Sequence, residues 1–329
     1  MSQLAIVFPG QGSQKTAMLA ELAQAPGNGI VETSFAEASA AIGSDLWDIA
    51  QRNPDGLLDQ TEFTQPALLA AGIALWRLWR GRGGARPDLL AGHSLGEYTA
   101  LVAAEVLEFS QAVKVVHQRG QFMQRAVPPG AGGIAAIIGL DSAKLKAVCL
   151  EAEAAGEGTV SPANHNSPGQ TVIAGDSAAV KRAMALCKQA GAKRALPLKM
   201  SVPSHCALME PARGQLETEL AKLEFRPAAI PVVQNATGRA SRDPEEIRHN
   251  LGAQLCSPVR WIDCVETMHA AGATHFLECG PGKVLAGLIK RIAPSAQTHN
   301  SEDPASLAAA LAETSASTST PSPLRATPP

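Results

Sequence analysis

Residues 88–107, DLLAGHSLGEYTALVAAEVL, decide the expected fold. The short apolar run at 88–92 predicts a buried strand, and the Ala/Leu-rich segment from 95 to about 107 predicts a helix. Between them lies Gly92-His93-Ser94-Leu95-Gly96, a G-x-S-x-G motif. Its two glycines permit a sharp strand-to-helix turn, which is the setting of a nucleophile elbow. The alternative without chemistry is a tight turn whose serine caps the helix.

Similar apolar runs recur along the chain. They predict strands at 4–8, 231–235 and 274–278, with long Ala/Leu-rich helical segments between them. Strands that alternate with helices favour a mostly parallel sheet covered by helices on both faces. Together with the serine motif, this order predicts an α/β fold with a large α/β-hydrolase-like domain.

The segment 130–200 has a different order of elements. Its patterns predict helices at 142–155 and 178–190, and strands at 133–140, 159–163, 170–174 and 195–200. The resulting βαββαβ order is typical of a ferredoxin-like unit. We therefore expect a large domain at 1–129 and 201–312, with a small ferredoxin-like domain, 130–200, inserted into it. The Ser/Thr/Pro-rich segment 313–329 is predicted to be a disordered tail.

Composition narrows the classes of function. The 329 residues are 45% hydrophobic and carry a formal net charge of −2, which argues against a general nucleic-acid binder. The apolar run at 4–8 is too short for a signal peptide, and the run at 67–79 is too short to span a membrane. Six cysteines are scattered without a CxxC pair, so neither a metal site nor a disulfide framework is expected. We expect a cytoplasmic protein.

A serine nucleophile needs a base. Of the eight histidines, His205 is the best candidate, because it follows the last strand of the inserted segment, where two domains should meet. His93 adjoins Ser94, but neighbouring side chains on a sharp turn point in different directions. Nothing in the sequence fixes the acid that a hydrolase triad would supply, so the pattern supports an ordinary triad only weakly.

Seven segments, in the same order along the chain, carry a resemblance to a known family. They are FPGQGSQ (8–14), TQPAL (64–68), GHSLGEY (92–98), QRG around Arg119, NSPGQ (166–170), VPSHCALM (202–209) and GPGKVL (280–285). From Ala5 to about Leu311 the chain resembles the malonyl-CoA:acyl carrier protein transacylases, the freestanding acyltransferases of bacterial fatty acid synthesis. One such segment alone would be weak support for membership of this family, whereas seven segments in the same order are strong support.

The resemblance implies roles for the reacting groups. Ser94 matches the nucleophile, and His205 matches the general base. The partner of that base is a backbone carbonyl at Gln254 rather than a carboxylate, which accounts for the missing triad acid. The backbone N–H groups of Gln11 and Leu95 match an oxyanion hole.

The resemblance also implies substrate-binding residues. Arg119 matches an arginine that holds a free carboxylate of the acyl group, a task suited to a planar guanidinium. Met123 lies one helical turn later and is expected to line the same pocket, although ordinary core packing fits it equally well. An acidic carrier protein would be attracted by basic residues near the cleft; the candidates are Lys193, Arg194, Lys199, Lys283, Lys290 and Arg291.

The implied activity is that of a malonyl-CoA:acyl carrier protein S-malonyltransferase. Ser94 would take the malonyl group from malonyl-CoA, and the phosphopantetheine thiol of acyl carrier protein would then accept it in a ping-pong mechanism that supplies fatty acid synthesis. The coenzyme A thioester is the substrate, so no cofactor is expected, and monomers are the family expectation. Three alternatives stay open: a serine hydrolase, the acyl-transfer subunit of malonate decarboxylase, and a catalytically silent carrier-binding module.

Overall fold

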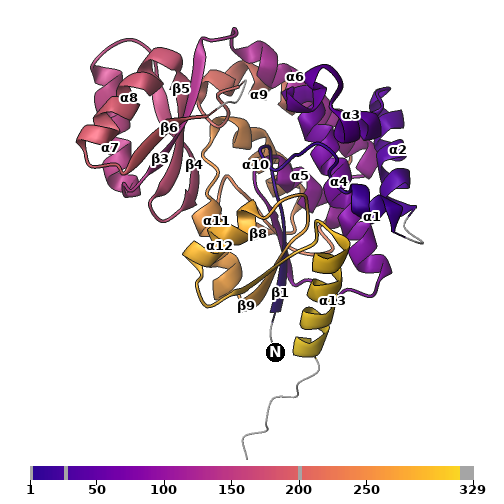
Figure 1. Ribbon diagram of the computed structural model, residues 1–329. Coiled ribbons are helices and arrows are strands. Elements are labelled where there is room, and N and C mark those ends of the chain that lie inside the picture. The colour runs from indigo at the N-terminus through magenta and orange to yellow at the C-terminus, as the bar shows by residue number, and fades with distance from the viewer. Residues whose placement is uncertain (1–2, 26–28, 199–201, 319–329) are drawn as a thin grey trace, which may run out of the picture.

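The computed structural model describes residues 3–25, 29–198 and 202–318, which form a large domain and a small one (Figure 1). The sheet of the large domain has the strand order β10-β9-β1-β2-β7-β8. All neighbouring strands are parallel except β7 and β8. The strands are β1 (Gln3–Phe8), β2 (Leu89–Gly92), β7 (Val232–Val233), β8 (Ala240–Ser241), β9 (Ala273–Glu278) and β10 (Gln297–Asn300).

Alternation along β1 decides which helices cover which face of this sheet. Leu4, Ile6 and Phe8 pack into the core formed with α2, α4, α5, α6 and α9. Ala5 and Val7 face the opposite way, toward α11 and α12. The helices are α1 (Ala20–Gln24), α2 (Ile30–Ile42), α3 (Leu46–Arg52), α4 (Thr61–Gly81), α5 (Leu95–Ala103), α6 (Phe109–Ala126), α9 (Glu210–Leu220), α10 (Pro244–Ala253), α11 (Trp261–Ala270), α12 (Val284–Ile292) and α13 (Pro304–Thr318), with short 3₁₀ segments at Pro54–Asp59, Ala207–Met209 and Gln254–Cys256.

The apolar run at 67–79 lies within α4, as expected for a core helix. Its side chains are buried almost throughout, including Trp79, which is fully enclosed. Among the residues that the structure describes, there is no helix with the length and apolar character needed to cross a membrane.

The small domain is an antiparallel sheet with the order β4-β5-β3-β6. Its elements are β3 (Gly132–Ile138), α7 (Ser142–Ala154), β4 (Val160–Ser167), β5 (Gln170–Asp176), α8 (Ser177–Gln189) and β6 (Arg194–Pro197). The two helices cover one face of the sheet, as Figure 1 shows. The predicted fold class, a large α/β-hydrolase-like domain with a mostly parallel sheet and a ferredoxin-like insertion, is confirmed. The end of the predicted strand at 195–200 lies outside the described residues.

The uncovered face of the small sheet is turned toward the large domain. Backbone bonds join the two: Val259 N–H donates to Ala163 O, and His165 N–H donates to Val259 O, each at 2.9 Å. Arg291 of α12 adds a side-chain bond to Gln170 of β5. These contacts fix the small domain beside the carboxyl ends of β1 and β2.

One sequence prediction needs correction, and two short strands were not predicted. The tail was expected to begin at residue 313, but α13 continues to Thr318, and residues 319–329 lie outside the described part. The alanine-rich run favours a helix, and Thr314 donates its hydroxyl to Ala310 O, 2.8 Å away, within that helix. The edge strands β8 and β10 were not predicted, because they are short and polar and show no apolar alternation.

Candidate active site

Ser94 sits on the turn between β2 and α5 with a backbone φ of 53°, a conformation that costs about 1–3 kcal/mol for a residue other than glycine. The flanking glycines make this turn possible. A Cβ added at Gly92 would lie 1.9 Å from the backbone of Gly96, and one added at Gly96 would lie 2.0 Å from Phe8 O. Ser94 N–H donates to Asn235 Oδ1 at 2.7 Å, which holds the turn from the neighbouring strand end.

The Ser94 hydroxyl lies 2.7 Å from His205 Nε2. On the other side of the ring, His205 Nδ1 lies 2.9 Å from the backbone carbonyl of Gln254. A carbonyl only accepts, so Nδ1 carries the proton and donates to it, which leaves Nε2 to accept from the serine hydroxyl. The predicted nucleophile, base and orienting carbonyl are therefore brought together in one chain of hydrogen bonds.

Arg119 reaches the same hydroxyl from α6. The residue is 1% exposed, and its guanidinium donates to Gln65 Oε1 (2.8 Å), Gln254 Oε1 (3.1 Å) and Ser94 Oγ (3.3 Å). Burial lowers the pKa of Arg119, but a guanidinium stays protonated in proteins. These three acceptors are two amides and a hydroxyl, none of them a carboxylate, so the site presents a buried positive charge next to Ser94.

A cavity of about 140 Å³ opens on Ser94 between the two domains. Six of the seven residues predicted for the site line it, and the seventh, Gln254, contacts three of the six from behind. Leu95 is the first residue of α5, where an N–H has no acceptor within the helix, and Gln11, in the loop that follows β1, lines the same cavity. The small domain lines the cavity with the apolar Ile134 and Val172 and with the amides of Asn164 and Asn166.

His205 is poised as a neutral base. Burial, and then the neighbouring positive charge of Arg119, lower its pKa to about 3. The imidazole is thus unprotonated above about pH 4 and can accept the serine proton.

The comparisons with known proteins agree with this geometry. Residues 5–311 match the family described as "Acyl transferase domain". A curated malonyl CoA-acyl carrier protein transacylase from Salmonella typhimurium is 55% identical over 95% of this chain and 100% of its own length. The chain belongs to this family of acyltransferases.

Solved structures of relatives extend the likeness to three dimensions. An acyl carrier protein S-malonyltransferase from Vibrio cholerae is 54% identical, with a TM-score of 0.90 over 94% of this chain and 99% of its own. A malonyl-transacylase solved in complex with a type II PKS acyl-carrier protein is 51% identical, with a TM-score of 0.92 over 95% of this chain and 100% of its own.

A larger cavity of this acyltransferase, about 320 Å³, lies between α2, α6 and α9. Its lining is mostly apolar, with Lys114, His117 and Lys222 among its polar members. It holds no serine or cysteine, so it lacks the nucleophile that acyl transfer by a covalent intermediate requires. The smaller cavity, in contrast, is lined by Ser94 with His205 beside it.

Several residues of the site were missed at the sequence level. His93 was considered only as a base, yet its ring lines the cavity and bonds through Nε2 to Asn166 Oδ1 at 2.8 Å. Gln65 holds Arg119, and Asn235 holds the turn. His93, Gln65 and Asn166 all lie in the quoted motifs, and Asn235 follows a parallel strand next to β2, a place where sites of α/β proteins gather.

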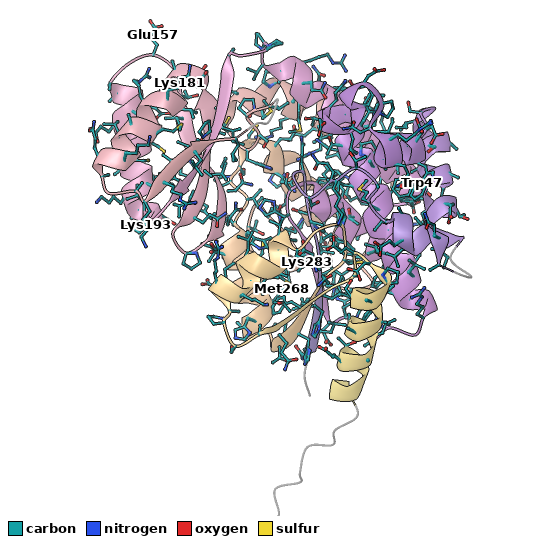
Figure 2. All side chains as sticks on the ribbon, viewed as in Figure 1. Trp47, Glu157, Lys181, Lys193, Met268 and Lys283 are labelled. Carbon is teal, nitrogen blue, oxygen red and sulfur yellow. The ribbon has the colours of Figure 1, made fainter. Side chains whose placement is uncertain are left out.

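The basic residues suggested for carrier binding are distributed over both domains. Figure 2 shows Lys193 on the small domain and Lys283 on the large one. Lys193, Arg194 and Lys283 are wholly or partly exposed, and Lys199 lies outside the described residues. Arg291 is engaged with Gln170, so it is held at the domain boundary rather than projecting freely.

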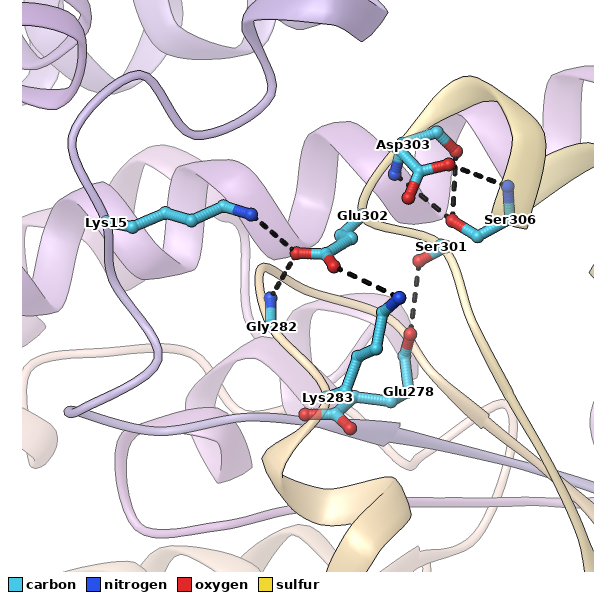
Figure 3. Close-up of polar contacts among 8 residues, drawn as sticks. All are labelled: Lys15, Glu278, Gly282, Lys283, Ser301, Glu302, Asp303 and Ser306. Atoms are coloured by element: carbon cyan, nitrogen blue, oxygen red, sulfur yellow. Dashed lines mark hydrogen bonds and ion pairs between the residues drawn. The ribbon is translucent and has the colours of Figure 1, made fainter.

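The loop that carries Gln11 is tied to two other loops at the carboxyl end of the sheet (Figure 3). Glu302 Oε2 accepts from Lys15 Nζ at 2.8 Å and from Gly282 N at 3.0 Å, and Glu302 Oε1 lies 3.6 Å from Lys283 Nζ. One carboxylate therefore joins the segments that follow β1, β9 and β10. The lysines are more than half exposed, so the Gly282 bond should be the stronger part of this tether.

Removal of the tether should cost stability. We expect Glu302→Ala to lower the free energy of unfolding by about 1–2 kcal/mol, because a backbone N–H loses its acceptor and two ion pairs are lost. Lys15→Met should lower it by less than about 1 kcal/mol. Chemical denaturation of both variants measures these values. Equal losses in the two variants would contradict the assignment of most of the stability to the Gly282 bond.

Proposed function

We propose that this acyltransferase moves the malonyl group from malonyl-CoA to the phosphopantetheine thiol of acyl carrier protein, through a malonyl ester on Ser94. One observation carries the proposal: Ser94 Oγ lies 2.7 Å from a neutral histidine and 3.3 Å from a buried guanidinium. The first neighbour activates a nucleophile, and the second selects an acyl group that bears a carboxylate. The names of the relatives support the same substrates.

In the first half-reaction, His205 Nε2 takes the Ser94 proton while Oγ attacks the thioester carbon. The negative charge of the tetrahedral intermediate develops on the former carbonyl oxygen. The N–H groups of Gln11 and Leu95 stabilise it, helped by the N-terminus of α5. When the carbon–sulfur bond breaks, the imidazolium returns its proton to the departing coenzyme A sulfur.

The second half-reaction runs the same steps in reverse. His205 takes the proton of the carrier thiol, and the thiol sulfur attacks the carbonyl carbon of the malonyl ester. Ser94 Oγ then leaves and receives the proton from His205. The groups that these steps require are the hydroxyl, the imidazole and backbone N–H groups, and the coenzyme A thioester enters as a substrate. A single set of residues therefore serves both halves of a ping-pong cycle, which would supply malonyl groups to fatty acid synthesis.

Arg119 has a second consequence for the base. The bound malonyl carboxylate offsets the positive charge that lowers the pKa of His205. The base therefore becomes stronger when an acidic acyl group occupies the cavity. A neutral acyl group does not raise the pKa of His205. The preference for malonyl over neutral acyl groups therefore arises in the proton transfer as well as in binding.

This coupling predicts a change in the pH profile when Arg119 is removed. Acetyl transfer by an Arg119→Ala variant should lose activity at a higher pH than acetyl transfer by the wild type. The sign follows from the charge: without Arg119 the pKa of His205 rises, so the ring becomes protonated, and inactive as a base, at higher pH. Only part of the lowering disappears, because burial remains. The measurement is kcat/KM for acetyl-CoA between about pH 3 and 8. Acid limbs at the same pH in both proteins would contradict the coupling.

The proposed function is tested by presenting the wild type with malonyl-, methylmalonyl- and acetyl-CoA and a carrier protein. We expect the highest kcat/KM for malonyl-CoA, because acetyl lacks the carboxylate and methylmalonyl carries an extra methyl group in a small cavity. Rapid release of malonate in the absence of any thiol would instead favour a hydrolase.

A further inference from the structure

Helix α5 begins with the sequence pattern of a capping box, but the hydrogen bonds of a capping box are not formed there. Ser94 and Glu97 have the S-x-x-E spacing of a capping box, in which each side chain caps the backbone N–H of the other residue. Here Ser94 makes no side-chain cap, and its N–H donates to Asn235 Oδ1. The serine hydroxyl is committed to His205. Ser94 and Glu97 therefore do not form a capping box, and the contacts of Glu97 have to explain its role.

Glu97 points into the protein behind the nucleophile, where its side chain is almost wholly enclosed. A single oxygen, Oε2, accepts from Gln254 Nε2 at 2.8 Å and from Asn235 N at 3.0 Å. Burial raises the pKa of Glu97 to about 7, against the opposing effect of these bonds. At neutral pH the group is therefore partly protonated, and its unprotonated oxygen can still accept both bonds.

The bond from Gln254 fixes the orientation of that amide. Gln254 Nε2 is directed to Glu97 and, at 3.1 Å, to Ser94 O. The amide oxygen must then point the other way, where it accepts from Arg119 Nη2 at 3.1 Å. If the amide were reversed, its NH₂ group would face the guanidinium, donor against donor. The backbone carbonyl of the same residue meanwhile holds His205.

Arg119 depends on this arrangement because it is buried and has few acceptors. Gln65 holds Nη1 and Gln254 holds Nη2, so the two amides together set the direction of the guanidinium plane. Tyr98 lies against its face, with the guanidinium carbon 5.5 Å from the ring centre. Loss of the Gln254 orientation would release the nitrogen that lies nearest to Ser94 Oγ.

We propose that Glu97 is a positioning residue that holds the Gln254 amide in the orientation that aims Arg119 at the carboxylate of the acyl group. The inference rests on the proposed function, since it concerns the selection of malonyl over neutral acyl groups. Glu97 touches no reacting atom, and its effect on Arg119 passes through Gln254.

The test measures the ratio of kcat/KM for malonyl-CoA to kcat/KM for acetyl-CoA in purified full-length variants. Glu97→Ala should lower this ratio about 10- to 100-fold, the effect of one hydrogen bond in a buried charged network. Glu97→Gln keeps an oxygen for both donors and should stay within about threefold of the wild type. Gln254→Met keeps the backbone carbonyl but loses the amide. It should match Glu97→Ala, and the double variant should show no further loss, because both changes break one linkage.

Glu278 provides a matched control, because it is also a buried acid near a helix N-terminus. It accepts from Leu285 N and Ala286 N of α12. Glu278→Ala should lower stability while leaving the malonyl-to-acetyl ratio unchanged.

The inference is overturned by a wild-type ratio in Glu97→Ala, by a loss in Glu97→Gln as large as in Glu97→Ala, or by additive losses in the double variant. If Glu97→Ala does not fold, Gln254→Met still tests the inference. A wild-type malonyl-to-acetyl ratio in Gln254→Met also overturns it. If the wild type itself shows no preference for malonyl-CoA, the proposed function fails instead, so the two failures are distinguishable.

Discussion

Ser94→Ala should reduce malonyl transfer from malonyl-CoA to acyl carrier protein by about 10⁴-fold or more. The hydroxyl makes the hydrogen bonds to His205 and Arg119, and its loss removes the group that would carry the ester. The variant should fold, because the turn is held by bonds of its backbone: Ser94 N–H to Asn235 Oδ1, and Ser94 O to Gln254 Nε2.

The rate is measured as malonyl-carrier formation under steady-state conditions, with circular dichroism to establish that the variant is folded. Ser204→Ala is the matched control, because it removes a hydroxyl from the wall of the same cavity. It should keep activity within about tenfold of the wild type. Substantial transfer by Ser94→Ala would mean that malonyl passes directly between thiols, and the covalent mechanism would be wrong.

Arg119→Ala should reduce kcat/KM for malonyl-CoA by about 10²- to 10³-fold, while transfer from acetyl-CoA is kept or improved. The malonyl carboxylate would enter a desolvated cavity without its partner, a loss of about 3–4 kcal/mol for a buried charged pair. Acetyl has no carboxylate to leave unpaired. The removal of a positive charge also strengthens His205 as a base, which favours the neutral acyl group.

Two companion variants sharpen this prediction. Arg119→Lys keeps the charge but loses the planar two-nitrogen geometry, so it should fall between the wild type and Arg119→Ala. Arg125→Ala removes a largely exposed arginine near the end of the same helix and should change neither substrate by more than about threefold. Equal losses for malonyl and acetyl in Arg119→Ala would show that this arginine supports the catalytic machinery in general and does not select the acyl group.

The sequence predicted the local parts of this structure well. The strand, turn and helix around Ser94 follow from short-range patterns, and the alternation of elements led to the parallel sheet and the ferredoxin-like insertion. The site residues Gln11, Arg119 and Gln254 came from the family resemblance, since an arginine or glutamine in a helix carries no chemical signal of its own. Their placement around one cavity is a product of the tertiary fold.

What escaped prediction depends on contacts between distant parts of the chain. The Asn235–Ser94 bond spans 141 residues and the Gln254–Glu97 bond spans 157, so no local pattern contains them. The S-x-x-E spacing at 94–97 even predicts different partners from those observed. The helical character of 313–318 was missed for a related reason: composition indicated disorder, whereas the alanine-rich start of α13 carries the helix onward.

The central claim, that Ser94 carries the malonyl group, is tested most directly by intact-protein mass spectrometry. The wild type is mixed with malonyl-CoA and then with acyl carrier protein bearing its phosphopantetheine arm. We predict that one malonyl group appears on the enzyme, maps to Ser94 after proteolysis, and moves to the carrier when the carrier is added. Failure to find the adduct on Ser94, or its release as malonate at the same rate with and without the carrier, would contradict the account.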